Sequence, residues 1–597
     1  MKLPALNFLR LAFLMLCFFP AGSASSQAQE KNPLYRQTSD VHHLMVQLQA
    51  DEGSLNRFYF MKNSPEYIDR FQQLYENYLQ QLGELNYEGM NAGSRVDYLL
   101  TKRDLENKLR LLNEAAFEYR QISKWVPFAE KVYALEKPRR RGLNINGQQI
   151  AAELNSIEKE LLLSRAALEK EEALNRDLAF RLQGTVKDLQ DALKSVYTFY
   201  NQYEPGFTWW VPEPYKRVDT LLTTYAALAE QKGKVPGKNQ KVDQSGIVGS
   251  PIGKEELIRQ LQYEMIPYTP EELIEIANKE FAWCDREMLK ASRELGFGDD
   301  WHQALEKVKN TYVPAGQQPE AMLELYNQSV AFLKQKDLIT IPPIAEETWR
   351  MQMMSPERQL INPFFLGGET FIISYPTHTM AHQDKLMSMR GNNPHFSRAT
   401  VHHELIAGHH LQGFMNNRYK EYRDFRTPFW TEGWALYWEM LLWDQGFPRS
   451  AEDRIGMLFW RMHRCARIIF SLNYHLGKWT PQESIDFLVE RVGHERANAE
   501  GEVRRSFEGR YSPLYQVAYM MGGLQFYALQ KELVGSGRMT NKQFHDAVLQ
   551  ENSLPVEMVR AVLTDQKLPK DYKTSWKFYR ESPSPGNSRK ATSVKSR

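Results

Sequence analysis

The sequence predicts a mainly α-helical protein with one small β-sheet, and three observations support that fold class. Residues 151–203 place apolar side chains at helical spacing, with charged side chains on the opposite face. Similar patterns run through residues 30–232 and 398–565. Two short β-branched segments bounded by Gly and Pro, LITIPP (338–343) and GETFIISYP (368–376), are expected to form strands. With 597 residues, the chain can build a large core of packed helices beside a minor sheet.

The first 28 residues are typical of a secretory signal peptide. Lys2 and Arg10 supply positive charge, and residues 11–19 form a short apolar core. Small residues follow, which place the cleavage site after Ala24 or Ala28. The apolar run is too short to span a bilayer. We therefore expect export to a periplasmic or extracellular space, without stable insertion into a membrane.

The three cysteines have different expected roles. Cys17 lies within the apolar core of the signal, and the residues before it are Leu and Met rather than the small residues of a lipoprotein signal. We therefore expect no lipid anchor at Cys17. Cys284 and Cys465 remain after cleavage, and they form either one disulfide or two buried thiols.

Composition changes divide the remaining chain. We expect a helical N-terminal region (29–235), a linker rich in Gly, Lys, Gln and Pro (236–256), a second helical region with the small sheet (257–578) and a disordered tail (579–597). The formal net charge is only +2, which argues against a nucleic-acid partner.

The strongest chemical signal is the segment TVHHELIAGHHLQ, residues 400–412. Catalytic zinc usually takes three protein ligands, and a short zinc-peptidase motif spaces two histidines four residues apart. Counting from His403 and Glu404, that position is Ala407, which cannot bind a metal. On a regular helix, the step from His403 to His409 is a rotation of about 600°, so the two side chains would point in different directions. His410 would be nearly aligned with His403 but would lie about 10 Å away along the axis.

A local departure from helical geometry would solve this spacing problem. Gly408 permits unusual backbone conformations, and π-type bulges often occur at functional sites. We predict a bulge near residues 406–408 that brings His403 and His409 together as ligands. His410 is the alternative second ligand, and His402 is expected to support a ligand or to lie at the surface.

The segment TEGWALYWE, residues 431–439, offers a third ligand. Glu432 lies in an apolar helix, where a carboxylate is costly unless it is paired or binds a metal. Glu439 is seven residues later on the same face, which suits a carboxylate that orients a ligand imidazole. The alternative for Glu432 is a buried pair with a histidine or an arginine.

These two segments together resemble the family named domain of unknown function 885, whose signature reads His-Glu-Ala-x-Pro-Gly-His-His-Leu-Gln and then Glu-Gly-Trp-Ala-x-Tyr. The resemblance implies a largely helical architecture similar to gluzincin zinc peptidases, with a stretched His-Glu-x-x-x-Gly-His-His motif and a glutamate as third ligand. Two departures stand out. Ala407 replaces the family proline, and Ser471 and Asn473 replace an aspartate and a glycine of a later motif.

Several other residues are candidates for contacts with substrate. Tyr519 matches a family tyrosine and is the candidate donor to the oxyanion, although a tyrosine beside Gly522 and Gly523 also suits a helix contact. Arg510 and Tyr511 are candidates to bind a substrate carboxylate or carbonyl. Arg467 and His475 are candidates for the same role, with a purely structural role as the alternative. The second His-Glu pair, at residues 494–495, is expected at the surface.

The sequence thus favours a secreted zinc metallopeptidase with one Zn²⁺ per chain, acting on short peptides. Glu404 would be the general base that activates the zinc-bound water. Exopeptidase and endopeptidase activity, residue preference and oligomeric state stay open at this point. Two alternatives remain: a metal-dependent amide hydrolase acting on other substrates, such as peptidoglycan fragments, and a non-catalytic binding protein on the same scaffold.

Overall fold

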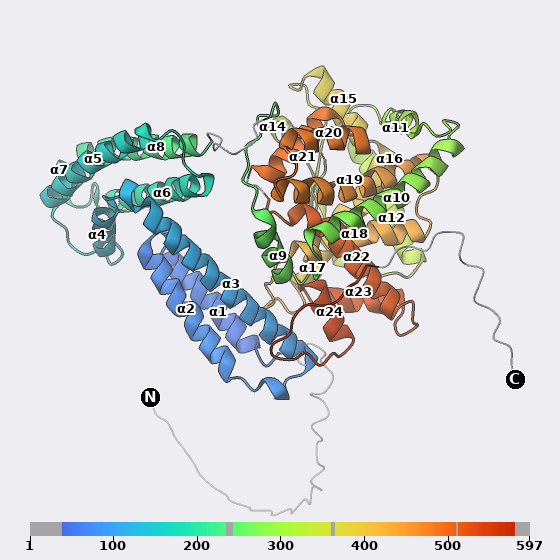
Figure 1. Ribbon diagram of the computed structural model, residues 1–597, viewed down its shortest axis with the longest axis horizontal. Coiled ribbons are helices and arrows are strands. Elements are labelled where there is room, and N and C mark those ends of the chain that lie inside the picture. Colours follow the sequence, from blue (N-terminus) through green and yellow to red (C-terminus); the bar gives the residue numbers. More distant parts are fainter. Residues whose placement is uncertain (1–38, 235–242, 360–363, 509–510, 580–597) are drawn as a thin grey trace, which may run out of the picture. The chain divides into compact units, whose positions relative to one another are not determined.

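A computed structural model describes residues 39–234, 243–359, 364–508 and 511–579. The predicted signal peptide with Cys17, the substrate candidate Arg510 and nearly all of the predicted tail lie outside these residues. The described chain is built almost wholly of α-helices, with one two-stranded sheet, which confirms the predicted fold class (Figure 1). None of its helices combines the length and the apolar character needed to cross a membrane.

The helices before residue 235 follow one another with short connections. They are α1 (His42–Phe58), α2 (Pro65–Glu84), α3 (Ala92–Ile122), α4 (Ala129–Arg139), α5 (Gly147–Lys170), α6 (Arg176–Tyr200), α7 (Pro205–Trp210) and α8 (Pro212–Lys234), with short 3₁₀ turns at Tyr87–Gly89 and Ser123–Trp125. Of the predicted linker, the described residues 243–252 form no helix or strand.

The second part of the chain contains the remaining elements. They are α9 (Gly253–Tyr263), α10 (Pro270–Glu294), α11 (Trp301–Lys309), α12 (Gln318–Gln335), α13 (Pro343–Thr348), β1 (Arg350–Met353), α14 (Pro356–Gln359), β2 (Thr370–Ile373), α15 (His382–Gly391), α16 (Pro394–Glu404), α17 (His409–Asn416), α18 (Pro428–Asp444), α19 (Ala451–His475), α20 (Pro481–Val492), α21 (Arg496–Phe507), α22 (Tyr515–Leu533), α23 (Asn541–Gln550) and α24 (Val556–Leu563).

Buried apolar side chains form two clusters, and their division does not follow the predicted linker. One cluster combines side chains from Val41 to Leu105 with most of the core after residue 247. The other lies within α4 to α8 and the segments beside them. A buried ion pair anchors α3 to the second part, because Arg423 Nε donates to Asp97 at 2.7 Å.

The sheet is smaller than predicted. β1 and β2 pair in parallel, with Arg350 opposite Thr370 and Met353 opposite Ile373. β2 lies within the predicted strand GETFIISYP, whereas the predicted strand LITIPP (338–343) is wrong. Two consecutive prolines end that segment, and Pro343 begins α13, where its missing N–H costs nothing.

Helix α18 positions the centre of the second core. It is apolar on all sides, and Trp430, Trp434 and Trp438 are almost completely buried. It packs along α22 at glycine contacts: a Cβ added at Gly433 would lie 2.5 Å from the Cα of Gly522. This close approach brings the start of α22 next to Glu432 of α18.

The two described cysteines are free thiols, so of the two predicted states the structure has the buried thiol pair. Cys284 lies in α10 and Cys465 in α19, and both are fully buried. Burial, together with the neighbouring Cys284 thiol, raises the pKa of Cys465 well above its usual value.

Candidate metal centre

The histidine segment contains an interruption rather than the predicted π bulge. Helix α16 ends at Glu404 and α17 begins at His409, with Leu405 in a non-helical conformation (φ −110°, ψ −109°). The N–H of Gly408 donates to the carbonyl of His402 at 2.9 Å, and Leu411 donates to Leu405 at 3.3 Å. Each bond spans six residues instead of four, so the turn is too wide for a π bulge and absorbs two extra residues.

Gly408 is required by this turn. A Cβ built at residue 408 would lie 1.7 Å from the carbonyl oxygen of His403, a backbone atom that cannot move away independently. Gly413, one turn into α17, has no atom within 4 Å of an added Cβ.

These two glycines supply a matched stability test. We expect Gly408→Ala to lower the free energy of unfolding by about 3 kcal/mol, because the methyl group displaces the ligand turn. Gly413→Ala should raise it by roughly 1 kcal/mol, since alanine is the better helix former. Urea unfolding monitored by circular dichroism measures both, and equal stabilities of the two variants would contradict the described turn.

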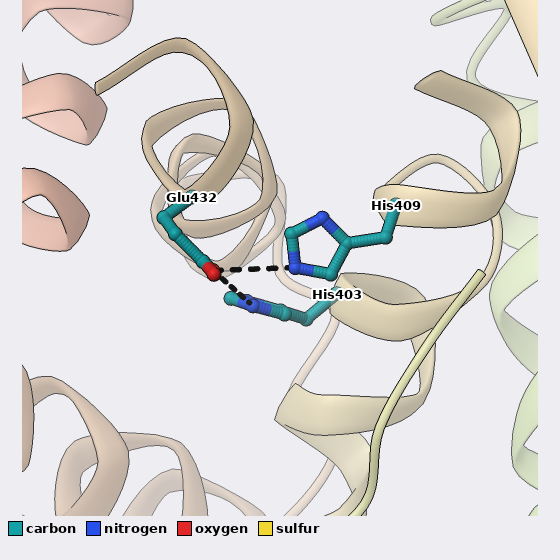
Figure 2. Close-up of side chains that lie close together, drawn as sticks. All are labelled: His403, His409 and Glu432. Atoms are coloured by element: carbon teal, nitrogen blue, oxygen red, sulfur yellow. Dashed lines mark ion pairs between the residues drawn. The ribbon is translucent and has the colours of Figure 1, made fainter. Parts of the chain in front are cut away.

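The interruption brings His403 and His409 onto one carboxylate. Figure 2 shows both imidazoles directed at Glu432 of α18. The distances from Glu432 Oε2 are 3.2 Å to His409 Nε2 and 3.6 Å to His403 Nε2. Within the described chain these three residues form the one group of His, Cys, Asp or Glu side chains whose ligand atoms all lie within 4.8 Å of one another.

The donor set and its spacing fit zinc. Ligand atoms bound at about 2.0–2.1 Å at the corners of a tetrahedron are roughly 3.3 Å apart, close to the two distances above. Glu432 Oε2 is buried and has no hydrogen-bond donor, as expected for an oxygen that binds a metal. Two imidazole nitrogens and one carboxylate oxygen make up a three-ligand set of the catalytic type.

A carboxylate behind His403 orients its ring. His403 Nδ1 and Glu439 Oε1 are 2.7 Å apart, which leaves Nε2 directed at the ligand group. Arg464 also donates to Glu439, at 3.3 Å. This is the arrangement predicted for Glu439.

Glu439 therefore has a testable effect on metal affinity. Glu439→Gln should weaken zinc binding by about 10- to 100-fold, because an amide holds and polarises the His403 imidazole less well. Competition with a fluorescent chelator measures the dissociation constant. An unchanged constant would remove Glu439 from the site.

The other histidines of the segment point elsewhere. His410 Nε2 lies 2.7 Å from the carbonyl oxygen of Ala345, so the geometry favours His409 over His410 as second ligand. His402 is buried and packs edge-on against Phe447, and burial lowers its pKa to about 4. It is therefore neither at the surface nor in the ligand group.

Tyr515 is a site residue that the sequence reading missed. Its hydroxyl donates to Glu432 Oε1, the oxygen that is not directed at the histidines. It lies one helical turn before Tyr519, and their rings are 5.8 Å apart. The only sequence signal for Tyr515 was its position four residues before Tyr519. Many tyrosines with that spacing only pack against neighbouring helices.

The charges at the centre are strongly coupled. Burial would lower the pKa of His403, but the neighbouring carboxylates Glu432 and Glu439 outweigh burial and raise the pKa to about 9. Burial would raise the pKa of Glu432, but the two histidines hold it well below its usual value. For Glu404 burial dominates and raises the pKa, against the opposing effect of His403 and His409.

A cavity of about 570 Å³ contains the ligand group and Glu404. Besides Glu404, three predicted substrate or catalytic residues line it: Tyr519, Tyr511 and Arg467. His475 does not: it is buried against Phe507 at the end of α19. Sequence reasoning also missed three arginines that line the cavity: Arg358, which is exposed, and the largely buried Arg464 and Arg505.

The chain matches a known family over most of its length. A family profile described as "Bacterial protein of unknown function (DUF885)" matches residues 59–563. This chain belongs to the DUF885 family.

Two solved structures share the fold of this DUF885 protein. One is described as "a putative lipoprotein of unknown function from Shewanella oneidensis", with a TM-score of 0.64 and 15% identity over 88% of this chain and 100% of that one. The other is described as "the putative lipoprotein from Colwellia psychrerythraea", with a TM-score of 0.55 and 14% identity over 88% and 98% of the two chains. No curated protein matches. At these identities the likeness shows the fold alone.

The structure also places two further residues of this DUF885 chain that the sequence singled out. His494, expected at the surface, is buried, and its Nε2 lies 2.8 Å from His463 Nδ1, because the loop between α20 and α21 folds over α19. Ser471, which replaces the aspartate of the resembled motif, donates to the carbonyl of Pro513 at 3.3 Å, just ahead of α22.

Proposed function

We propose that this DUF885 protein is an exported zinc-dependent peptidase. One observation carries the proposal: Glu404, a carboxylate that is not part of the ligand group, shares a cavity with His403, His409 and Glu432. A site that only binds a metal has no need of a further carboxylate directly after a ligand. A hydrolase needs one, because a water molecule must lose a proton as it attacks the substrate carbonyl.

Each group of residues in the cavity has its own role in the proposed hydrolysis. When bound by His403, His409 and Glu432, zinc supplies Lewis-acid polarisation of the scissile carbonyl and the attacking water. Glu404 accepts the water proton and delivers it to the leaving amine. Its raised pKa suits both tasks, since the proton must be released again.

Tyr519 is the donor best placed for the developing oxyanion. It lines the cavity, and its ring lies parallel to that of His403, with the centroids 6.3 Å apart. Burial raises its pKa well above the usual value, so the hydroxyl keeps its proton and can donate it in a hydrogen bond.

Export has two lines of support: the N-terminal pattern of the sequence, and the description of both similar structures as lipoproteins. Those descriptions also make lipid attachment at Cys17 a specific alternative to cleavage after Ala24 or Ala28. Mass spectrometry of the mature protein from membrane and soluble fractions decides between the two.

A peptide-library assay tests the activity. The zinc-loaded protein should hydrolyse short peptides, lose that activity in the presence of a chelator and recover it with one equivalent of Zn²⁺. Cleavage of peptidoglycan fragments but not peptides would favour the alternative amide hydrolase. Tight zinc binding without any hydrolysis would favour the non-catalytic scaffold.

A further inference from the structure

Three arginines form a buried cationic wall in the metal cavity. Arg464 and Arg467 come from α19 and Arg505 from α21, and all three line the cavity that holds the ligand group. Their side chains are only 5%, 3% and 11% exposed. Guanidinium groups are seldom buried to this extent unless an anion compensates them.

The arginines are held in place by two carboxylates. Glu502 of α21 accepts a hydrogen bond from Arg467 Nε at 2.7 Å and another from Arg505. Gln516 of α22 also donates to Glu502, at 2.8 Å. Glu439 pairs with Arg464, but it is shared with His403. The wall is therefore rigid before any substrate enters.

The hydrogen bonds of the wall leave donors of Arg464 and Arg467 unused. Arg467 pairs with Glu502, and Arg464 pairs with Glu439, which is shared with His403. Arg467 Nη1 and Arg464 Nε are buried without a hydrogen-bond partner. Burial would lower the pKa of Arg467, but Glu502 more than offsets it and the pKa is raised, so this side chain stays charged. Arg464 and Arg467 thus keep donors that an incoming anion could satisfy.

This wall lies close to the reacting centre. The guanidinium carbons of Arg467 and Arg464 lie 4.3 and 4.9 Å from the ring centre of Tyr519. That same ring lies parallel to the imidazole of His403. Tyr519 therefore lies beside both the cations and the ligand histidine. Trp460 and Phe364, whose rings are 4.8 Å apart, supply apolar surface in the same cavity.

We propose that the arginine wall binds the free C-terminal α-carboxylate of a peptide, so that the protein acts as an exopeptidase at the carboxyl end. Planar guanidinium groups match a carboxylate and bind it through charge-assisted hydrogen bonds. The proposal rests on the proposed peptidase function. Hydrolysis adds water across the scissile C–N bond: the oxygen goes to the carbonyl carbon, and the C-terminal fragment leaves with a new amine.

The body of the substrate has room beyond the metal. A second cavity of about 640 Å³ shares Asn416, Thr431, Glu432 and Tyr515 with the first. It contains none of the three wall arginines. A peptide with its carboxylate at the wall would therefore pass Glu432 and extend into this second cavity.

A binding experiment tests the carboxylate site without catalysis. Isothermal titration calorimetry compares N-acetyl-Ala-Ala with its C-terminal amide on the zinc-loaded Glu404→Gln variant. We expect the acid to bind about 10- to 100-fold more tightly, the range for hydrogen bonds to a charged group. Arg467→Gln should make the affinities for the acid and the amide nearly equal. Arg467→Lys should restore part of the difference between them. Arg454→Gln, on the same helix but outside the cavity and paired with Glu294, should leave the difference intact.

Kinetics supply an independent readout on the wild-type protein. kcat/KM for a peptide acid should exceed that for its amide by about 10- to 100-fold, and product analysis should show cleavage near the carboxyl end. A peptide amide that ends in glutamate tests whether the wall binds an acidic side chain instead of the α-carboxylate. If this amide is hydrolysed as fast as the peptide acid, the α-carboxylate is not the group that the wall recognises. Equal rates for acid and amide would overturn the carboxylate site while leaving the peptidase intact. If the acid binds tightly but no peptide is cleaved, the peptidase and exopeptidase proposals fail while the carboxylate site stands.

Discussion

Glu404→Gln is expected to lower kcat by about 10³-fold while one zinc ion per chain remains bound. Glutamine keeps the size of the side chain but cannot accept the proton of the attacking water. The ligand group is untouched, because Glu404 is not among the three clustered ligands. Steady-state kinetics on a peptide substrate, combined with metal analysis of the same sample, measures the two quantities together.

A matched control keeps this result interpretable. Glu490→Gln makes the same change on an exposed residue of α20 that lines neither of the two cavities. It should retain both activity and zinc. If Glu404→Gln hydrolyses peptides as fast as the wild type, Glu404 is not the general base.

The second large effect concerns the metal. His409→Asn and Glu432→Gln should each weaken zinc binding by more than the ~100-fold that loss of an outer supporting carboxylate costs, because each removes a ligand atom. Activity should fall in parallel. Titration with Zn²⁺ in a metal buffer, followed by elemental analysis, measures the affinities.

His410→Asn is the matched control for the histidine variant. His410 is the next residue, but its Nε2 contacts the Ala345 carbonyl and not the ligand group. This variant should therefore keep stoichiometric zinc even if it is less stable. Loss of zinc from His410→Asn with retention in His409→Asn would reverse the choice between the two histidines.

Much of the fold could be read from the sequence because helical periodicity is a local signal. The apolar spacing of residues 151–203 corresponds to α5 and α6, and the β-branched run after residue 368 contains β2. The segment LITIPP failed because its two prolines favour the start of a helix over strand pairing. The contacts between α1–α3 and the second part could not be predicted, because they join residues hundreds of positions apart.

For the candidate site as well, local patterns could be predicted and long-range packing could not. Four site residues could be predicted: His403, His409, Glu432 and Glu439. Burying such polar or charged side chains in apolar segments costs free energy, and their spacing suits metal ligands. Tyr515, Arg464 and Arg505 could not. A tyrosine or arginine on a helix has no distinctive local pattern, and only the packing of α19, α21 and α22 directs these side chains into one cavity.

By itself the sequence determined a mainly helical fold, a pair of histidines with a glutamate between them, and a buried carboxylate on a second helix. Those features follow from local patterns of residue type and spacing. Only the tertiary structure decided that His409 rather than His410 meets His403, and that three arginines stand beside them. Both depend on directions set elsewhere: the turn at Gly408 rotates α17 relative to α16, and the close glycine contact between α18 and α22 brings the tyrosines to the ligand group.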